Sequence, residues 1–383
     1  MNKPRFEVLD GLRGVAAILV VWFHISECFS YDPVDKWLNH GFLAVDFFFV
    51  LSGFVISYSY DDRWGKTLNT WSFFRRRLIR LHPLVILGAL IGLFAFYFSD
   101  CATYAGVTNV RWYVLLGSVL LSALLIPQPA GWNLRGVEEL SSVNIPEWSL
   151  MFEYVGNILY ALIFRHLNTL WLCISVSIAA LLLLDTSLSL NVFGLITPQE
   201  DVPLYLNAGF YFYPDHVYIG MTRLCYPFLT GILIARLCSK KFIENASKSI
   251  TTNSLSYGFW LCAIITPYVG GREHNIYDGI FQACATLFIF PLVVSIGAKS
   301  AMVEGWQDRL CKFFGKISYP LYITHYPLVY CFLAWLDRNP EASTDARVLG
   351  AICLFTADLL IAYAAMKLWD EPIRAWLGKK YNK

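Results

Sequence analysis

Residues 9–24 of the chain read LDGLRGVAAILVVWFH, and this stretch sets the fold class. With its continuation to residue 29 it approaches the about 20 apolar residues that a membrane-spanning helix needs, and ten similar runs follow it. The chain is 57% hydrophobic and 15% charged, whereas ordinary globular proteins carry about 25% charged residues. We therefore predict an all-α fold, a polytopic membrane helical bundle.

The eleven apolar segments do not fit one simple topology. Short loops rich in Lys and Arg face the cytoplasm, and loop 61–82 and both ends of the chain are of this kind, so both termini are predicted to be cytoplasmic. That orientation requires an even number of spans. We take 112–126, which shares the shortest length with 256–270, as the segment that does not span, leaving about ten transmembrane helices. The segments are residues 11–29, 42–60, 83–98, 112–126, 149–165, 168–184, 222–238, 256–270, 279–297, 318–337 and 346–368.

These segments are predicted to form a single membrane-embedded domain over residues 1–383, with a basic cytoplasmic tail at about residues 369–383. No Gly/Ser-rich linker and no repeat period divides them. The ten cysteines include no CxxC pair and no mixed Cys/His cluster, so we predict neither a disulfide framework nor a metal site. The first segment has no small-residue cleavage site and is expected to remain as a span.

Ionisable groups in a span cost several kcal/mol unless they are paired or face water, so function is sought there. Arg13 and His24 are eleven residues apart, which places them on one helix face about 16 Å apart along the axis, with Asp10 within roughly 40° of the same line. Arg13 either anchors the helix at the lipid interface or belongs to the site. His24 either bonds a neighbouring helix or transfers protons, since an imidazole titrates near neutrality.

Two carboxylates lie within apolar segments. Asp46 is surrounded by phenylalanines in GFLAVDFFFVLSGFVIS (41–57), and it either pairs with a cation on another helix or caps a bend. Ser52 and Gly53 in the same segment favour close helix packing. Glu153 lies nearly two turns into PEWSLMFEYVGNILY (146–160), either as the partner of a buried cation or as a general acid or base.

Residues 73–83 read FFRRRLIRLHP, with four arginines in six positions. Arg76, Arg77 and Arg80 lie at helical neighbour spacing and form a dense cationic face. Such a face is either an ordinary signal for a cytoplasmic loop or a binding site for a phosphate-bearing cytoplasmic ligand, because the planar guanidinium suits phosphates.

A histidine also lies in the tenth apolar segment. Residues 314–330, FGKISYPLYITHYPLVY, place His325 among tyrosines that include Tyr319. His325 is either a hydrogen-bonded structural residue or part of the site.

Together these motifs resemble the acyltransferase-3 family of membrane-bound acyltransferases. The resemblance rests on LDGLRGVAAILVVWFH with its Arg-x10-His, VDFFFVLSGFVIS, the arginine cluster before Pro83, WSLMFE, FGKISYPLYITH and DEPIR at 370–374, which run in the family's order from residue 9 to 374. The chain departs from the pattern at His82, where an aromatic or aliphatic residue is usual, and at NILY after the glutamate. No SGNH-like hydrolase domain is expected after the last span.

The resemblance implies roles for individual residues. His24 corresponds to the family's essential histidine, Arg13 to its partner arginine, and Arg77 with Arg80 to its Arg-x-x-Arg pair. Glu153 is the glutamate after WSL. We add Asp46 as a catalytic candidate, since either Glu153 or Asp46 could orient the imidazole. Arg76 is a candidate for donor binding, and the further candidates are Asp10, Ser149, Tyr319 and His325.

The resemblance also implies a reaction. Members of the family move an acyl group, commonly acetyl, from a cytoplasmic coenzyme A thioester to a hydroxyl of a cell-surface or exported glycan. We therefore expect acetyl-CoA or another acyl-CoA as donor, no metal, membrane lipids as surroundings, no nucleic-acid partner and a bacterial inner-membrane location. His24 would act as general base or as a transient acyl carrier. The alternatives are a non-glycan hydroxyl acceptor and, from another class, a transporter, whose proton and substrate paths also contain buried charges.

Overall fold

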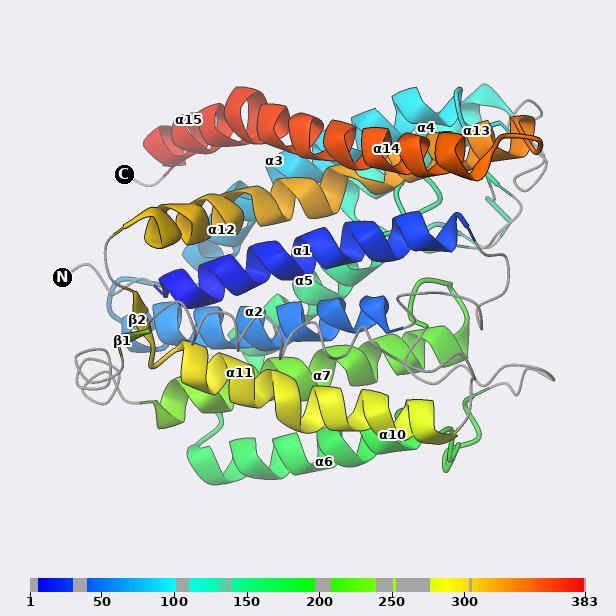
Figure 1. The fold of residues 1–383 in the computed structure, drawn as a ribbon. Helices are drawn as coiled ribbons and strands as arrows, with labels where there is room; N and C mark the ends of the chain where they lie inside the picture. The colour runs from blue at the N-terminus through cyan, green and yellow to red at the C-terminus, as the bar shows by residue number, and fades with distance from the viewer. Residues whose placement is uncertain are drawn as a thin grey trace.

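The all-α prediction is confirmed by a computed structural model, which describes residues 6–29, 40–100, 110–129, 131–132, 134–135, 139–196, 208–238, 251–252, 276–302 and 305–381. Long helices lie side by side, with α1 in the middle of the bundle, the C-terminal helices along one edge and α6 along the other (Figure 1). The helices are α1 (Glu7–Glu27), η2 (Gly41–Leu43), α2 (Ala44–Tyr60), η3 (Asp61–Arg63), α3 (Thr70–Phe96), α4 (Trp112–Leu124), α5 (Glu147–Leu162), η5 (Phe164–His166), α6 (Thr169–Ser187), α7 (Pro214–Leu237), α10 (Ile276–Cys284), η7 (Ala285–Ile289), α11 (Phe290–Gly297), α12 (Trp306–Thr324), α13 (Tyr326–Arg338), α14 (Thr344–Ala364), η8 (Ala365–Asp370) and α15 (Glu371–Tyr381). A parallel pair of two-residue strands, β1 (Thr251–Thr252) and β2 (Ala301–Met302), is present as well.

Several of these helices can cross a bilayer. Within the described residues, seven are long and apolar enough: Glu7–Glu27, Gly41–Arg63, Thr70–Phe96, Thr169–Ser187, Pro214–Leu237, Ile276–Gly297 and Thr344–Tyr381. The chain is therefore a multi-pass membrane protein. Helix α4, in the segment predicted not to span, has 13 residues and is about 20 Å long, shorter than the about 30 Å hydrocarbon core. The predicted segment 256–270 lies outside the described residues.

Two pairs of helices pack closely through glycines. In the α2–α7 pair, a Cβ on Gly53 would come within 2.0 Å of the Phe228 carbonyl oxygen, and one on Gly231 within 2.1 Å of the Val50 carbonyl oxygen. In the α1–α12 pair, a Cβ on Gly14 would come within 2.3 Å of the Phe314 Cβ. Small residues allow helix backbones in a membrane to approach at this range, so the packing role predicted for Gly53 is confirmed.

Helix α3 begins earlier than the sequence prediction. An apolar segment starting at Pro83 was expected, but the helix begins at Thr70, where Asn69 and Ser72 form a capping box, and it continues through Pro83. The capping box satisfies the first free amides of the helix. The arginine cluster therefore lies on the first turns of the helix itself, in a fixed register with the apolar part.

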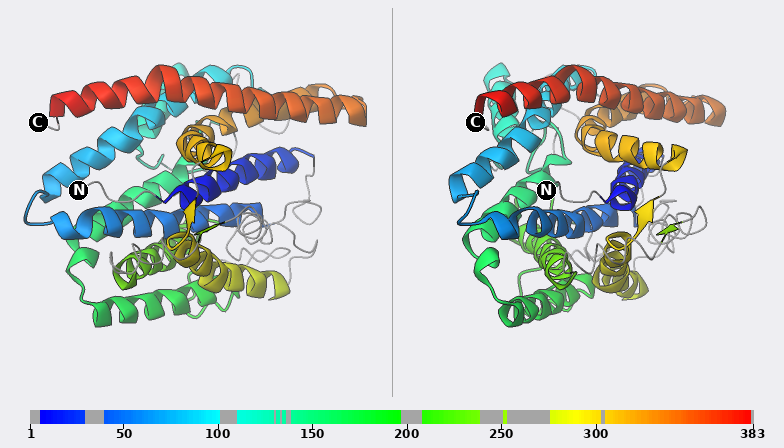
Figure 2. Two further views of the ribbon diagram at one scale, coloured as in Figure 1. Left: turned by 60° about the vertical axis from the view of Figure 1, so that its left-hand side comes forward. Right: turned by 90° about the vertical axis from the view of Figure 1, so that its left-hand side faces the viewer.

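The C-terminal tail is helical. After α14 the chain passes through the π-helical segment η8 and continues as α15 to Tyr381. The continuous helix Thr344–Tyr381 has 38 residues and is about 57 Å long, well beyond the thickness of the hydrocarbon core. Figure 2 shows α3 rising obliquely across the bundle toward this C-terminal helix, and the two are in contact. The predicted basic tail is therefore one wall of the bundle.

Candidate active site

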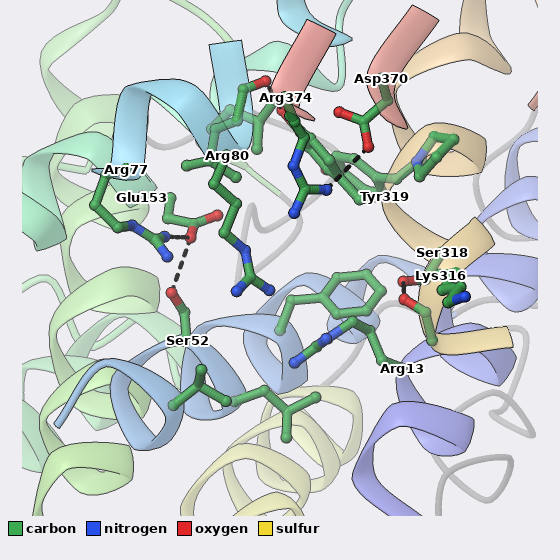
Figure 3. Close-up of a pocket in the computed structure, with 18 of the residues that line it drawn as sticks. Arg13, Ser52, Arg77, Arg80, Glu153, Lys316, Ser318, Tyr319, Asp370 and Arg374 are labelled. Atoms are coloured by element: carbon green, nitrogen blue, oxygen red, sulfur yellow. Dashed lines mark hydrogen bonds and ion pairs between the residues drawn. The ribbon is translucent and has the colours of Figure 1, made fainter. Parts of the chain in front are cut away.

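A cavity of about 760 Å³ opens between α1, α2, α3, α5, α12 and the C-terminal helix (Figure 3). Its volume lies within the about 300–1,000 Å³ of small-molecule sites. Among the charged side chains of its wall, cations outnumber carboxylates. The cations are Arg13, Arg76, Arg77, Arg80, Lys316 and Arg374, and the acids are Asp10, Glu153, Asp370 and Glu371.

Three helices meet at Glu153. Its Oε1 accepts a hydrogen bond of 2.5 Å from Arg77 Nη2 on α3 and one of 2.9 Å from Ser52 Oγ on α2. Both contacts are drawn in Figure 3. Arg77 is buried, while the Glu153 side chain remains 19% exposed toward the cavity. Glu153 is thus the partner of a buried cation, one of the two roles that the sequence left open.

The other cations differ in their pairing. Arg13 contacts Asp10 at 3.3 Å and Arg374 contacts Asp370 at 2.9 Å, each within its own helical segment. Arg76, Arg80 and Lys316 line the cavity without an ion pair to any described residue. In Figure 3 the guanidinium groups of Arg80 and Arg13 point into the same space. The cavity therefore contains cationic side chains that can bind an anionic ligand.

Hydroxyl groups also line the cavity. Ser149 Oγ and the Tyr322 hydroxyl are 2.6 Å apart, and the Tyr319 hydroxyl donates to the Leu81 carbonyl oxygen at 2.8 Å. Tyr322 lines the cavity, and its ring centroid lies 6.1 Å from that of His325. Tyr322 therefore lies between the cavity and the buried histidine at the α12–α13 junction, as a neighbour of both.

His24 lies beyond this wall, outside the residues that line the cavity. Its ring stacks on His325 with a centroid distance of 5.4 Å, and its side chain is 19% exposed. Its Nδ1 lies 2.8 Å from Glu27 Oε2. An ionised carboxylate can only accept, so Nδ1 carries the hydrogen and Nε2 of the neutral ring is left with a free lone pair.

The carboxylate that orients His24 is therefore not one of those predicted. Glu153 is held by Arg77 and Ser52. Asp46 accepts from Arg223 at 2.7 Å in an ion pair whose side chains are 0% and 1% exposed. Glu27 takes the position instead, because it lies three residues after His24 on α1 and shares its helix face.

Arg223 is the most fully bonded cation of the described core. Besides Asp46, it donates to the carbonyl oxygens of Ala208 and Phe42, each at 2.9 Å, and it stacks near the Trp148 ring at 5.0 Å. This pair joins α2 to α7. Asp46 is thus the partner of a cation on another helix, as one reading of the sequence had it, and it makes no contact with His24.

The structure thus gathers most of the predicted residues into two adjoining places. Those in the cavity are Asp10, Arg13, Arg76, Arg77, Arg80, Ser149, Glu153 and Tyr319, while His24 and His325 form the stacked pair. Sequence reasoning missed Lys316, Asp370, Arg374, Glu27 and Arg223 as members of the site and its support. An arginine at the start of the apolar segment 222–238 was a usable signal for Arg223, since such a charge needs a partner.

The fold and the site together define a class: a multi-pass membrane protein in which a cationic cavity adjoins an imidazole held by a carboxylate. The comparison with known families is specific. The family model described as "Acyltransferase domain" matches residues 6–367, and the chain belongs to this acyltransferase-3 family.

Curated relatives agree with this assignment. The chain is 35% identical over 166 residues to "Protein 2 in picA locus" of Rhizobium radiobacter, covering 41% of this chain and 81% of the relative. It is 23% identical over 386 residues to the peptidoglycan O-acetyltransferase OatA of Listeria monocytogenes, covering 96% and 55%. It is 24% identical over 348 residues to the O-acetyltransferase OatA of Staphylococcus aureus, covering 86% and 51%. The chain therefore spans about half the length of the two OatA proteins. No solved structure matches it.

Proposed function

We propose that this protein is a membrane-bound O-acyltransferase that moves an acyl group, acetyl in the first instance, from cytoplasmic acyl-CoA to a hydroxyl of a cell-surface or exported glycan. The site of action is a bacterial inner membrane. The family and the names of two relatives support the reaction class. The observation that carries the proposal is the cationic cavity, whose lining residue Tyr322 lies next to the stacked pair of His24 and His325.

The donor side of the proposal rests on charge. Arg76, Arg80 and Lys316 line the cavity without an ion pair among the described residues, and hydrogen bonds between arginine and phosphate are the strong, charge-assisted kind. These side chains would hold the phosphates of coenzyme A at the basic end. Arg13 and His24 lie on one face of α1 about 16 Å apart, so the acyl end of an extended donor would point toward the imidazole.

The chemical step needs one base. His24 Nε2 removes the proton of the acceptor hydroxyl while the hydroxyl oxygen attacks the thioester carbonyl carbon. The carbon–sulfur bond then breaks, and the departing thiolate takes the proton from His24. An O-acyl ester and free coenzyme A are the products. Glu27 holds the imidazole in the tautomer that this step requires and stabilises its cation.

Free thiol release from acetyl-CoA by the protein in nanodiscs, with and without a cell-surface glycan extract, tests the proposal. We expect glycan-dependent release by the wild type. His24→Ala should lower kcat by about 100-fold or more, the contribution of a general base. Arg80→Ala should raise the KM for acetyl-CoA by about tenfold, the loss of one charge-assisted hydrogen bond.

Matched controls use residues outside the site. His166→Ala removes an exposed histidine, and Arg309→Ala removes an exposed arginine of α12 that does not line the cavity; both should behave as the wild type. Equal turnover by wild type and His24→Ala would remove the catalytic role of His24. Absence of thiol release by the wild type, with every glycan extract and every short acyl-CoA tried, would contradict the acyltransfer proposal and favour the transport alternative.

A further inference from the structure

His325 lies where the helix breaks between α12 and α13. Helix α12 ends at Thr324, and α13 begins at Tyr326 with Pro327 in its first turn. Proline has no amide hydrogen to give to the carbonyl oxygen four residues earlier, which is that of Ile323. Asn144 Nδ2 donates to this oxygen instead, at 2.9 Å. The break is therefore built into the structure, and it fixes the backbone beneath His325.

The backbone also fixes the tautomer of His325. Its Nδ1 lies 2.9 Å from the Tyr322 carbonyl oxygen and 3.2 Å from that of Leu321. Carbonyl oxygens only accept hydrogen bonds, so Nδ1 carries the hydrogen. In the neutral ring Nε2 must then be an acceptor. This nitrogen is buried, and in the neutral ring it can only accept a hydrogen bond.

This acceptor has no donor among the residues that the structure describes. His325 is 0% exposed, and its Nε2 is buried without a hydrogen-bond partner there. Leaving a buried acceptor unsatisfied costs about 1–3 kcal/mol. The bonds of Nδ1 explain how the ring is held but give no reason for a nitrogen at the far side of the ring, where a carbon would carry no such cost.

The surroundings of this nitrogen belong to the reaction centre. The His325 ring stacks on His24 at a centroid distance of 5.4 Å, and the ring centroid of Tyr322, which lines the cavity, is 6.1 Å from that of His325. His24 Nε2 also has a free lone pair, because Glu27 occupies its Nδ1. Two neighbouring imidazoles therefore each present an accepting nitrogen. One substrate hydroxyl has one hydrogen to donate and satisfies one of them.

We propose that His325 Nε2 accepts a hydrogen bond from a second donor of the acceptor substrate, a hydroxyl or amide N–H next to the hydroxyl that His24 deprotonates. This inference rests on the proposed acyltransfer function. It makes His325 a positioning residue that selects acceptors with two neighbouring donors, as sugars and amino sugars have, over simple alcohols. A site built to bond such a group rejects a substrate that lacks it.

Two substitutions at this position separate the roles of the two nitrogens. In His325→Asn the shorter amide can still donate to the Tyr322 carbonyl oxygen but places nothing at the position of Nε2. In His325→Gln the longer side chain carries an amide oxygen to that position. Each variant in nanodiscs is compared with the wild type for acetyl-CoA binding, thermal unfolding, and the kcat and KM of transfer to peptidoglycan fragments and to the cell-surface glycan extract.

We expect His325→Asn to lower kcat/KM for the glycan acceptor by about 10- to 100-fold, the effect of one lost hydrogen bond at a buried site. Acetyl-CoA binding should be unchanged, and His325→Gln should recover most of the loss. Wild-type transfer by His325→Asn would overturn the inference while leaving the proposed function intact. Equal losses in both variants, or a parallel loss of acetyl-CoA binding, would also overturn it and show a structural role. Absence of transfer by the wild type itself would instead contradict the proposed function.

Discussion

Two of the ion pairs that join helices in the described bundle, each between an arginine and a carboxylate, have different surroundings. Asp46 and Arg223 join α2 to α7 with side chains 0% and 1% exposed, and the remaining donors of Arg223 go to backbone carbonyl oxygens. Glu153 and Arg77 join α5 to α3 on the wall of the cavity, where Glu153 is 19% exposed and also bonds Ser52.

The comparison teaches that an intramembrane charge is not by itself a sign of catalysis. A pair whose donors and acceptors are all used by the protein fixes helix geometry. A pair that borders a cavity can still interact electrostatically with a ligand bound there. The two ion pairs consist of the same kinds of residue. They differ in whether the packing of the helices leaves them in contact with the cavity.

Removing one partner of the closed pair should have the largest effect. Arg223→Met leaves Asp46 as an unpaired buried charge, and breaking a pair of this kind costs about 3–5 kcal/mol. We expect most of the variant to be lost as misfolded protein, measured by size-exclusion chromatography and thermal unfolding after detergent extraction. The double variant Asp46→Leu/Arg223→Met removes both charges and should recover most of the folded fraction. A single variant as stable as the wild type would break the distinction between the two pairs.

The open pair should respond in activity more than in stability. Glu153→Gln keeps the shape of the side chain but removes the charge that holds Arg77, so Arg77 is expected to reorient in the cavity. We predict a rise of about tenfold in the KM for acetyl-CoA, within the range for one charge-assisted hydrogen bond, with a smaller fall in unfolding temperature than for Arg223→Met. Steady-state kinetics beside thermal unfolding would check this. A loss of folding equal to that of Arg223→Met would show that both pairs are structural.

The buried carboxylate Glu139, in the loop between α4 and α5, sharpens the comparison, because it has no ion pair within the described residues. Burial raises its pKa to about 8 from the ordinary 4.5, against the opposing effects of the Arg135 guanidinium and the Tyr330 hydrogen bond. The folded chain therefore holds this proton more tightly than the unfolded chain. The contribution of this protonated carboxyl to the free energy of unfolding is fully present below about pH 4.5 and is lost as the pH rises through about 8.

Replacing Glu139 by Gln should remove this pH dependence. Between about pH 6 and about pH 9 we expect the unfolding temperature of the wild type to fall by more than that of Glu139→Gln, since other titrating groups are common to both proteins. Thermal unfolding in the same detergent at both pH values measures the difference. Parallel curves for the two proteins would mean that Glu139 is ionised in the fold and paired like the other two carboxylates.

The sequence predicted the helices better than it predicted which side chains pair with one another. Apolar length predicted the helices, and the spacing of Arg13 and His24 correctly placed them on one helix, because both properties are local. The partner of His24 was also local, since Glu27 lies three residues later on the same helix face, but the sequence analysis overlooked it. That Glu153 and Asp46 are held by arginines of other helices instead is decided by tertiary packing. Arg374 was assigned to a tail because nothing local in the sequence shows that η8 and α15 continue the helix of α14 and pack against α3.

The C-terminal helix has a consequence for how the protein is made. Arg13 comes from the first described helix and Arg374 from the last, and both line the same cavity. Because synthesis runs from the N-terminus, the cavity has all of its walls only once residues up to Gly378, which also lines it, have left the ribosome. A nascent chain whose earlier helices are already in the bilayer therefore still lacks the part of the cavity wall that Asp370, Arg374 and Gly378 supply.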